Sequence, residues 1–123
     1  MGVPNLTHLQ YLVLAHLTAA ARTGNELRSV LKQHGVQQSG PAFYQLMGRL
    51  ERSSLVRGKY QPSGAGGHTC RERRYQITSA GVDAWEQALA FYLGTLEAVA
   101  RDRRRGDRSA PFVIPSDPMG ILR

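Results

Sequence analysis

The sequence is poor in cysteine and has no long apolar run, and each shortage excludes a class of protein. Its single cysteine, Cys70, rules out a disulfide within the chain and fits a reducing compartment. The apolar stretch from Leu9 to Leu17 contains His16 and is too short to span a bilayer. It also lacks the basic segment and the cleavage site of a signal peptide. We therefore expect a soluble, cytoplasmic protein.

Acidic residues and lysines are also scarce. The 123 residues include 16 Lys and Arg against 9 Asp and Glu, a formal net charge of +7. Lys32 and Lys59 are the only lysines, so nearly all of the positive charge is carried by arginine. The planar arginine fork suits phosphate and guanine, which favours nucleic acid over a membrane surface as the partner. The length fits one domain with appendages.

The first third of the chain predicts two helices. Leu6 to about Ala19 is apolar over much of its circumference, as in a helix buried between neighbours. Thr23 and Glu26 have the spacing of a capping box at the start of a second helix, and Gly35 is a natural stop. The face of this second helix is predicted to consist of Leu27, Val30, Leu31 and His34.

A third helix is predicted from about Gly40, with Ser39 or Gly40 as its cap and Pro41 in its first turn. Its apolar face comprises Phe43, Leu46, Met47 and Leu50. Its opposite face comprises Gln45, Gly48 and Arg52, flanked by Tyr44 and Arg49. Two short helices, a tight link and a third helix with a polar front have the spacing of a helix-turn-helix. The alternative is an ordinary surface helix.

Two alternating runs, from Leu55 to Gln61 and from Arg71 to Thr78, surround the glycine-rich stretch from Pro62 to Thr69. This pattern predicts a β-hairpin. Its basic residues are Arg57, Lys59, His68, Arg71, Arg73 and Arg74, against the single acid Glu72. A basic hairpin with a glycine-rich tip can approach a phosphate backbone, as the wing of a winged helix does; the alternative is a solvated charged loop.

The last predicted helix is capped by Thr78 and runs to about Arg105. Its apolar residues alternate in steps of three and four, as in a heptad seam: Val82, Trp85, Leu89, Tyr92, Leu96 and Val99. A domain of this size does not need so long a helix for its own core, so we interpret it as a dimerisation arm; the alternative is that the seam packs only within the chain. The segment 106–123 contains three prolines and is expected to be irregular.

Together these elements predict a mainly α fold with a small β-hairpin. Residues 1–78 would form a winged helix-turn-helix DNA-binding domain, 79–105 a long C-terminal dimerisation helix, and 106–123 an irregular tail. From about Leu6 to Leu96 the chain resembles the PadR family of winged-helix transcriptional regulators. The motifs are Gly24–Leu27, then Ser39, Phe43-Tyr44, Leu46, Arg49–Glu51 and Leu55-Val56, and finally Arg73–Gly81. The chain departs from the family pattern at Asn25, Gln45 and Ser54, where an aromatic, a proline and a glycine are usual.

The resemblance implies a homodimer that binds a roughly palindromic operator, usually as a repressor. It also implies that some members sense small aromatic molecules at the dimer interface. The predicted DNA-binding residues are Ser39, Tyr44, Gln45, Arg49, Arg52, Lys59, Arg71, Arg73 and Arg74. An effector pocket is predicted from Trp85, Phe91 and Tyr92, although packing alone would also explain Trp85.

Signatures of catalysis are missing: the sequence contains no nucleophile elbow, phosphate loop or cofactor fingerprint. The four histidines show no metal-ligand spacing, and no metal or cofactor is predicted. Cys70 is either a redox-sensitive thiol or a plain small residue. Two other functions remain open: a winged-helix adaptor whose basic surface meets an acidic protein, and a nonspecific or RNA-binding basic domain.

Overall fold

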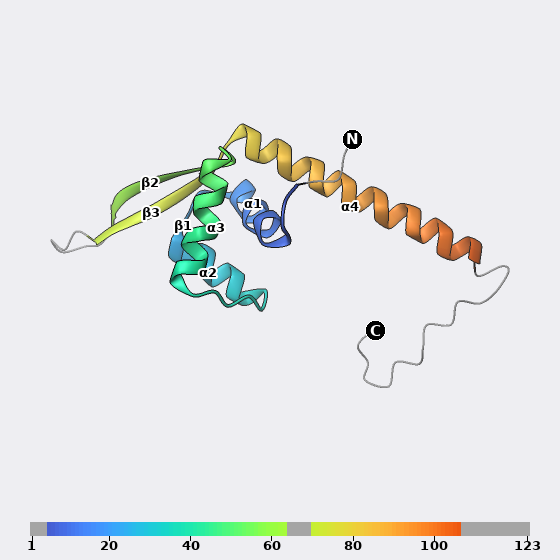
Figure 1. Ribbon diagram of the computed structural model, residues 1–123, viewed down its shortest axis with the longest axis horizontal. Helices are drawn as coiled ribbons and strands as arrows, with labels where there is room; N and C mark the ends of the chain where they lie inside the picture. The colour runs from blue at the N-terminus through green and yellow to red at the C-terminus, as the bar shows by residue number, and fades with distance from the viewer. Residues whose placement is uncertain (1–4, 64–69, 107–123) are drawn as a thin grey trace. The chain divides into compact units, whose positions relative to one another are not determined.

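The computed structural model describes residues 5–63 and 70–106, and the side chains of 62–71 are outside the description. Its elements are α1 (His8–Ala19), β1 (Arg22–Thr23), α2 (Gly24–Gln33), α3 (Gly40–Arg52), β2 (Val56–Ser63), β3 (Cys70–Ile77) and α4 (Ser79–Gly106), as Figure 1 shows. Contacts divide the chain into two compact units, Met1–Leu89 and Ala90–Arg123. The predicted mainly α fold with a β-hairpin is confirmed.

Side-chain caps determine where the first two helices begin. At α2 the predicted capping box is present: Glu26 N–H donates to Thr23 Oγ1 at 3.2 Å, and Thr23 N–H donates to Glu26 Oε1 at 3.3 Å. The same arrangement occurs at Thr7 and Gln10, where it starts α1 at His8. The predicted start at Leu6 is therefore wrong, because the extended backbone of Thr7 forms the cap.

The helices bury one contiguous core against the sheet. Its members are Val13, Leu14, Leu17, Leu27, Leu31, Phe43, Leu46, Met47, Leu50, Val56 and Tyr75. All four residues of the predicted α3 face are among them, and so are two of the four predicted for α2. Of the other two, Val30 is half-buried, and His34 is exposed because it is the C-cap that follows the last residue of α2. Gly35 follows with φ +81°, the left-handed backbone typical of a helix stop.

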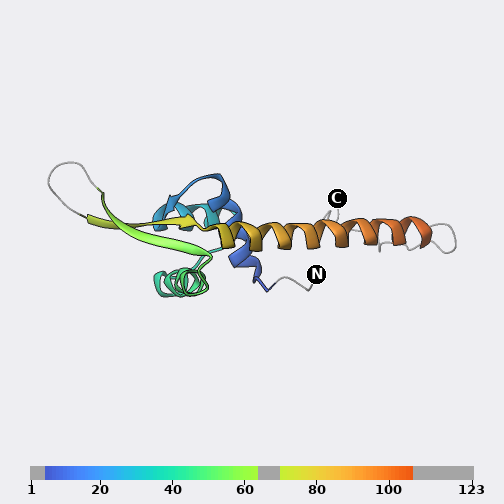
Figure 2. The same cartoon turned by 90° about the horizontal axis from the view of Figure 1, so that it is seen from above.

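The sheet is antiparallel, with strand order β1-β3-β2. β2 and β3 form the predicted hairpin and run side by side in Figure 2, in a register from Val56 opposite Ile77 to Ser63 opposite Cys70. The predicted loop from Pro62 to Thr69 is thus too long, since strand pairing continues to Ser63. β1 was not predicted, because its two residues are too few to show an alternation; it pairs with β3 through Arg22 and Thr23.

A network of hydrogen bonds joins the end of α3 to the start of α4. Thr78 N–H donates to the Leu55 carbonyl at 3.1 Å, and Thr78 Oγ1 donates to the Ser54 carbonyl at 2.7 Å. The same hydroxyl accepts from Gly81 N–H at 3.0 Å, so the predicted cap of the last helix is confirmed. Ser54 makes this turn with φ +60°, which is strained for any residue other than glycine.

Replacing Ser54 with glycine is therefore expected to stabilise the protein. Relief of the left-handed strain outweighs the added backbone entropy of the unfolded chain, for a net gain of about 0.5–1 kcal/mol. Urea unfolding at equilibrium measures the change. Ser53→Gly is the matched control: Ser53 has an ordinary φ of −82°, so glycine there should lower the stability. Equal effects at the two positions would contradict the assignment of strain to Ser54.

Helix α4 changes in exposure along its length. In the first unit, Val82, Trp85 and Leu89 are half-buried. In the second unit, the exposed fractions are 47% for Tyr92, 52% for Leu93, 65% for Leu96 and 48% for Val99. Within the part of the chain that the structure describes, no helix combines the length and the apolar character needed to cross a membrane.

Candidate nucleic-acid interface

Helix α3 presents a polar face backed by the core. Tyr44 is 59% exposed, and Gln45, Arg49 and Arg52 are exposed as well. Neither arginine forms an ion pair with another described residue. Because Phe43, Leu46, Met47 and Leu50 are buried on the opposite side, the orientation of this polar face is fixed by packing rather than by its own contacts.

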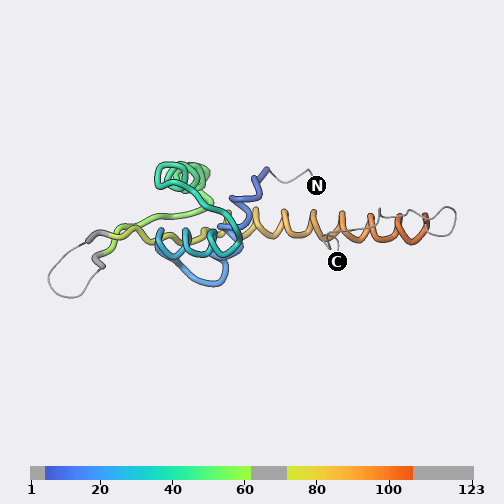
Figure 3. The backbone as a smooth tube through the Cα atoms, turned by 90° about the horizontal axis from the view of Figure 1, so that it is seen from below, coloured from blue at the N-terminus to red at the C-terminus, as the bar shows by residue number. Residues whose placement is uncertain are grey.

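Ser39 has a local structural role at the start of α3. Its Oγ accepts a hydrogen bond from Ala42 N–H at 3.2 Å, and Pro41 lies in the first turn, as the sequence predicts. Figure 3 follows the backbone from α2 through the link into this helix start. Ser39 Oγ acts only as an acceptor in this cap, so the Ser39 hydroxyl can still donate a hydrogen bond to a ligand.

Arg73 and Glu51 connect the wing to α3. Arg73 Nε donates to Glu51 Oε1 at 3.0 Å, and Arg73 Nη2 donates to Oε1 at 2.9 Å and to Oε2 at 3.0 Å. The guanidinium also lies 4.7 Å from the centroid of the Tyr60 ring. Both charged side chains are about three-quarters buried, with exposed fractions of 25% and 27%. This pair braces the hairpin against the third helix.

Because Gly58 of β2 has no side chain, the Glu51–Arg73 pair can occupy the space beside it. A Cβ at this position would collide with Glu51 Oε1 and would lie 2.6 Å from Arg73 Nε. The sequence does not predict the pair, because its partners are 22 residues apart and belong to separate motifs. With Glu51 bound to Arg73 and Glu26 to the α2 cap, Arg49 is not held by either acid.

Two pKa shifts follow from this packing. Burial by itself would lower the pKa of Arg73, but the hydrogen bonds and charge of Glu51 raise it above its ordinary value. Burial, with a smaller contribution from Glu51, raises the pKa of Tyr75 to about 12. Both Arg73 and Tyr75 therefore keep their protonated forms at neutral pH.

The opposite face of the hairpin is strongly basic. Lys59 and Arg74 are directly opposite each other on β2 and β3, and Arg57 is two residues away. These cations line a groove of about 240 Å³ with Ala21, Gln61 and Gln76. Like charges opposite each other destabilise a sheet, and an anion would relieve the repulsion. Arg74 is steadied by donating to the Ala21 carbonyl at 3.3 Å.

The structure does not describe all of the predicted wing residues. His68 lies outside the described residues, and the side chains of Arg71 and Cys70 are also outside the description. The predicted DNA-binding role of Arg71 therefore stays a prediction, as do the two alternatives for Cys70, a redox-sensitive thiol and a plain small residue. Of the predicted wing cations, the structure brings Lys59 and Arg74 together and places Arg73 in the brace.

Two histidines meet although the sequence offers no local signal for it. His16 in α1 and His34 at the end of α2 are 18 residues apart, and their Nε2 atoms are 3.1 Å apart. Burial, then the charges of His34 and Arg22, lower the pKa of His16. A hydrogen bond between two imidazoles requires at least one to be neutral, which the lowered pKa favours. Among the described residues, no group of three potential metal ligands is present.

Trp85 packs on α1. Its ring stacks on Tyr11 with centroids 6.2 Å apart, and its Nε1 is buried without a hydrogen-bond partner among the described residues. Phe91 and Tyr92, the other predicted effector residues, form an edge-on ring pair with centroids 5.4 Å apart in the second unit. The unpaired indole N–H is a feature that the sequence could not reveal.

No family model matches the sequence, and no curated protein matches it. Solved structures do match. A PadR-family transcriptional regulator from Eggerthella lenta is 26% identical with a TM-score of 0.61, covering 76% of this chain and 79% of that one. A PadR-family regulator from Clostridium difficile is 17% identical with a TM-score of 0.66, covering 77% and 97%.

A third match carries a ligand. The Bacillus subtilis PadR structure, solved in complex with operator DNA, is 16% identical with a TM-score of 0.58; the match covers 68% of this chain and 47% of that one. These similarities agree with the sequence motifs, which resemble the same family. The chain therefore has the winged-helix fold of the PadR-family transcriptional regulators.

Proposed function

We propose that this protein is a PadR-like, sequence-specific DNA-binding regulator of transcription. The observation that carries the proposal is the polar face of α3, where Gln45, Arg49 and Arg52 are exposed on a helix whose other side is buried. The similar fold of a regulator that was solved with operator DNA supports it. A function in transcription also fits the expected cytoplasmic location.

The side chains of α3 suit the edges of base pairs. An amide such as that of Gln45 can pair with adenine, and a guanidinium such as that of Arg49 or Arg52 can pair with guanine in the major groove. Ser39 and Tyr44 carry hydroxyls that suit phosphate oxygens. In the wing, Lys59, Arg71 and Arg74 would supply phosphate contacts, and Arg73 would hold the wing in place through Glu51.

We further propose that the regulator is a homodimer acting as a repressor. The exposed side chains of Tyr92, Leu96 and Val99 continue the seam that Val82, Trp85 and Leu89 begin, and the exposed Leu93 lies beside it. A second copy of the same helix would cover them. Two α3 helices would then read half-sites about 34 Å apart on a pseudo-palindromic operator. In this scheme 1–78 binds DNA and 79–105 dimerises.

A small aromatic effector is part of the proposal. The Trp85 side chain is half-buried, so an aromatic acid or phenol could stack on the exposed part of its ring. Tyr92 and Phe91 would complete the pocket across the dimer. Quenching or a shift of Trp85 fluorescence by planar aromatics would support it, and an unchanged emission spectrum over a broad panel would contradict it.

The function is tested by selecting bound sequences from a random DNA pool. We expect an enriched inverted repeat, and Arg49→Ala and Arg52→Ala should each weaken binding to it by about 1–3 kcal/mol. Arg101→Ala, which removes an exposed charge from α4, is the matched control and should leave the affinity nearly unchanged. A pool without any enriched sequence, with a binding constant no better than for random duplex, would contradict the proposal.

A further inference from the structure

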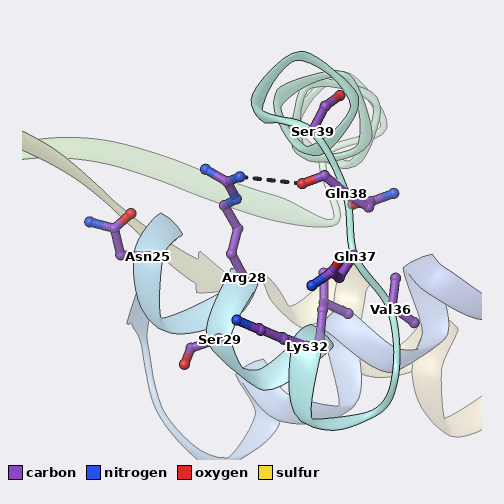
Figure 4. Close-up of a pocket in the computed structure, with 9 residues that line it drawn as sticks. Asn25, Arg28, Ser29, Lys32, Val36, Gln37, Gln38 and Ser39 are labelled. Atoms are coloured by element: carbon purple, nitrogen blue, oxygen red, sulfur yellow. Dashed lines mark hydrogen bonds between the residues drawn. The ribbon is translucent and has the colours of Figure 1, made fainter.

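A cavity lies between α2 and the link that leads into α3. It has a volume of about 600 Å³ and is open to solvent. Residues 36–39 of the link form one wall, and Asn25, Arg28 and Lys32 of α2 belong to the other (Figure 4). We call it the link cavity. It includes Ser39 at the start of α3 and shares no residue with the basic groove on the hairpin.

Arg28 is the central cation of the link cavity, and it is held in place. Its Nη2 donates to the Gln38 carbonyl at 3.2 Å, as the dashed line in Figure 4 marks, and its guanidinium carbon lies 5.9 Å from the centroid of the Phe43 ring. The bond to the Gln38 carbonyl occupies only one of the five N–H donors of the Arg28 guanidinium. The fork is therefore oriented before any ligand arrives, with donors left for one.

The charge of the link cavity is not balanced by its walls. Lys32 follows Arg28 by four residues, so the two cations share one face of α2, where like charges repel. No acidic residue is among the described residues that line the cavity, and neither cation forms an ion pair with a described residue. Asn25, which lines the cavity, donates to Glu72 Oε1 at 3.5 Å.

The other lining groups suit an oxyanion too. Ser29, Ser39 and the amides of Asn25 and Gln37 are neutral hydrogen-bond donors around the two cations. We propose that the link cavity is a phosphate-binding site in which Arg28 supplies a bidentate fork and Lys32 a mobile second charge. The phosphate would belong either to a small phosphorylated molecule or to the backbone of bound DNA; only the second source depends on the proposed function.

The site would connect ligand binding to the position of α3. The link is short, and the same residues that line the cavity lead directly into the Ser39 cap. A phosphate held between α2 and the link would therefore restrict the entry of the chain into α3. A free phosphorylated ligand at this site would act as an effector of DNA binding, whereas a backbone phosphate would fix the helix on the duplex.

The first arm of the test uses the full chain without DNA. Isothermal calorimetry and thermal melting are run with inorganic phosphate against chloride at equal ionic strength. If the phosphate is a free ligand, we expect saturable binding that weakens at least fivefold in Lys32→Gln and in Arg28→Gln, while Arg28→Lys binds between these and the wild type. Lys32 is exposed, so its replacement should not disturb folding. Arg101→Gln is the charge-matched control.

The second arm measures how DNA binding depends on salt. If the phosphate belongs to the DNA backbone, Lys32→Gln should reduce the slope of log K against log salt by about 1, uniformly across sequences. Either result supports the site and identifies its ligand. If phosphate binding is unchanged in Lys32→Gln and in Arg28→Gln, and the salt slope is unchanged in Lys32→Gln, the proposal is overturned. Should the wild type bind no DNA at all, the proposed function fails and the first arm alone decides the site.

Discussion

Replacing Gly81 with alanine is expected to lower the free energy of unfolding by about 2–3 kcal/mol, the cost of overpacking a closed site. A Cβ at Gly81 would collide with the Leu55 carbonyl oxygen and would lie 2.7 Å from Ile77 Cγ1. The carbonyl belongs to the backbone turn that Thr78 holds by two hydrogen bonds, so it cannot move away cheaply. Urea unfolding followed by circular dichroism measures the loss.

Gly94→Ala is the matched control for this prediction. Gly94 also lies within α4, but nothing is within 4 Å of the position that its Cβ would take. Alanine favours a helix over glycine, so this substitution should stabilise the protein by about 0.5–1 kcal/mol. Opposite signs at the two glycines would establish that contact with Leu55, and not helix propensity, determines the effect. A neutral result at Gly81 would show that the junction between α3 and α4 is loose.

Replacing Leu96 with aspartate is expected to abolish the proposed dimer and to weaken operator binding about 100-fold or more. Leu96 is 65% exposed, and a charge at the centre of an apolar seam would lie unpaired at the interface. Without the partner, each α3 would bind its half-site alone and would lose the gain from two linked contacts. Sedimentation equilibrium at micromolar concentration and a DNA titration measure the two effects.

Ala98→Asp provides the control for the seam. Ala98 is exposed two residues further along α4, outside the steps of three and four that define the seam. It adds the same charge to the same helix, so it should leave both the dimer and the DNA affinity nearly intact. A wild-type protein that is monomeric at micromolar concentration would contradict the dimer directly. Equal losses in the two variants would indicate damage to the helix instead of to an interface.

The brace between Glu51 and Arg73 changes how the basic wing is understood. Four candidate wing cations look alike in the sequence: Lys59, Arg71, Arg73 and Arg74. In the fold, Arg73 is committed to Glu51, whereas Lys59 and Arg74 face the basic groove on the other side of the sheet. Alternation along β3 separates Arg73 from Arg74, but only the register with β2 and the position of α3 show which side carries the acid.

The sequence by itself determined the features that depend on near neighbours. The capping box at Thr23, the Pro41 start of α3, its apolar face and the Thr78 cap are all patterns within a few residues, and the structure confirms each of them. The hairpin is also present, because alternation and glycine-rich turns are local signals. The apolar seam of α4 is exposed at Tyr92, Leu96 and Val99, and its packing against a second copy of the helix is a proposal.

Only the tertiary structure decided which distant residues meet. Nothing near Gly58 or Gly81 in the sequence shows that a side chain there would collide with the Glu51–Arg73 pair or with Leu55. The contact of His16 with His34 and the cavity beside Arg28 likewise depend on how α1, α2 and the link pack. Local patterns repeat with the period of a helix or strand and can be read along the chain, whereas these contacts exist only after the core has brought separate elements together.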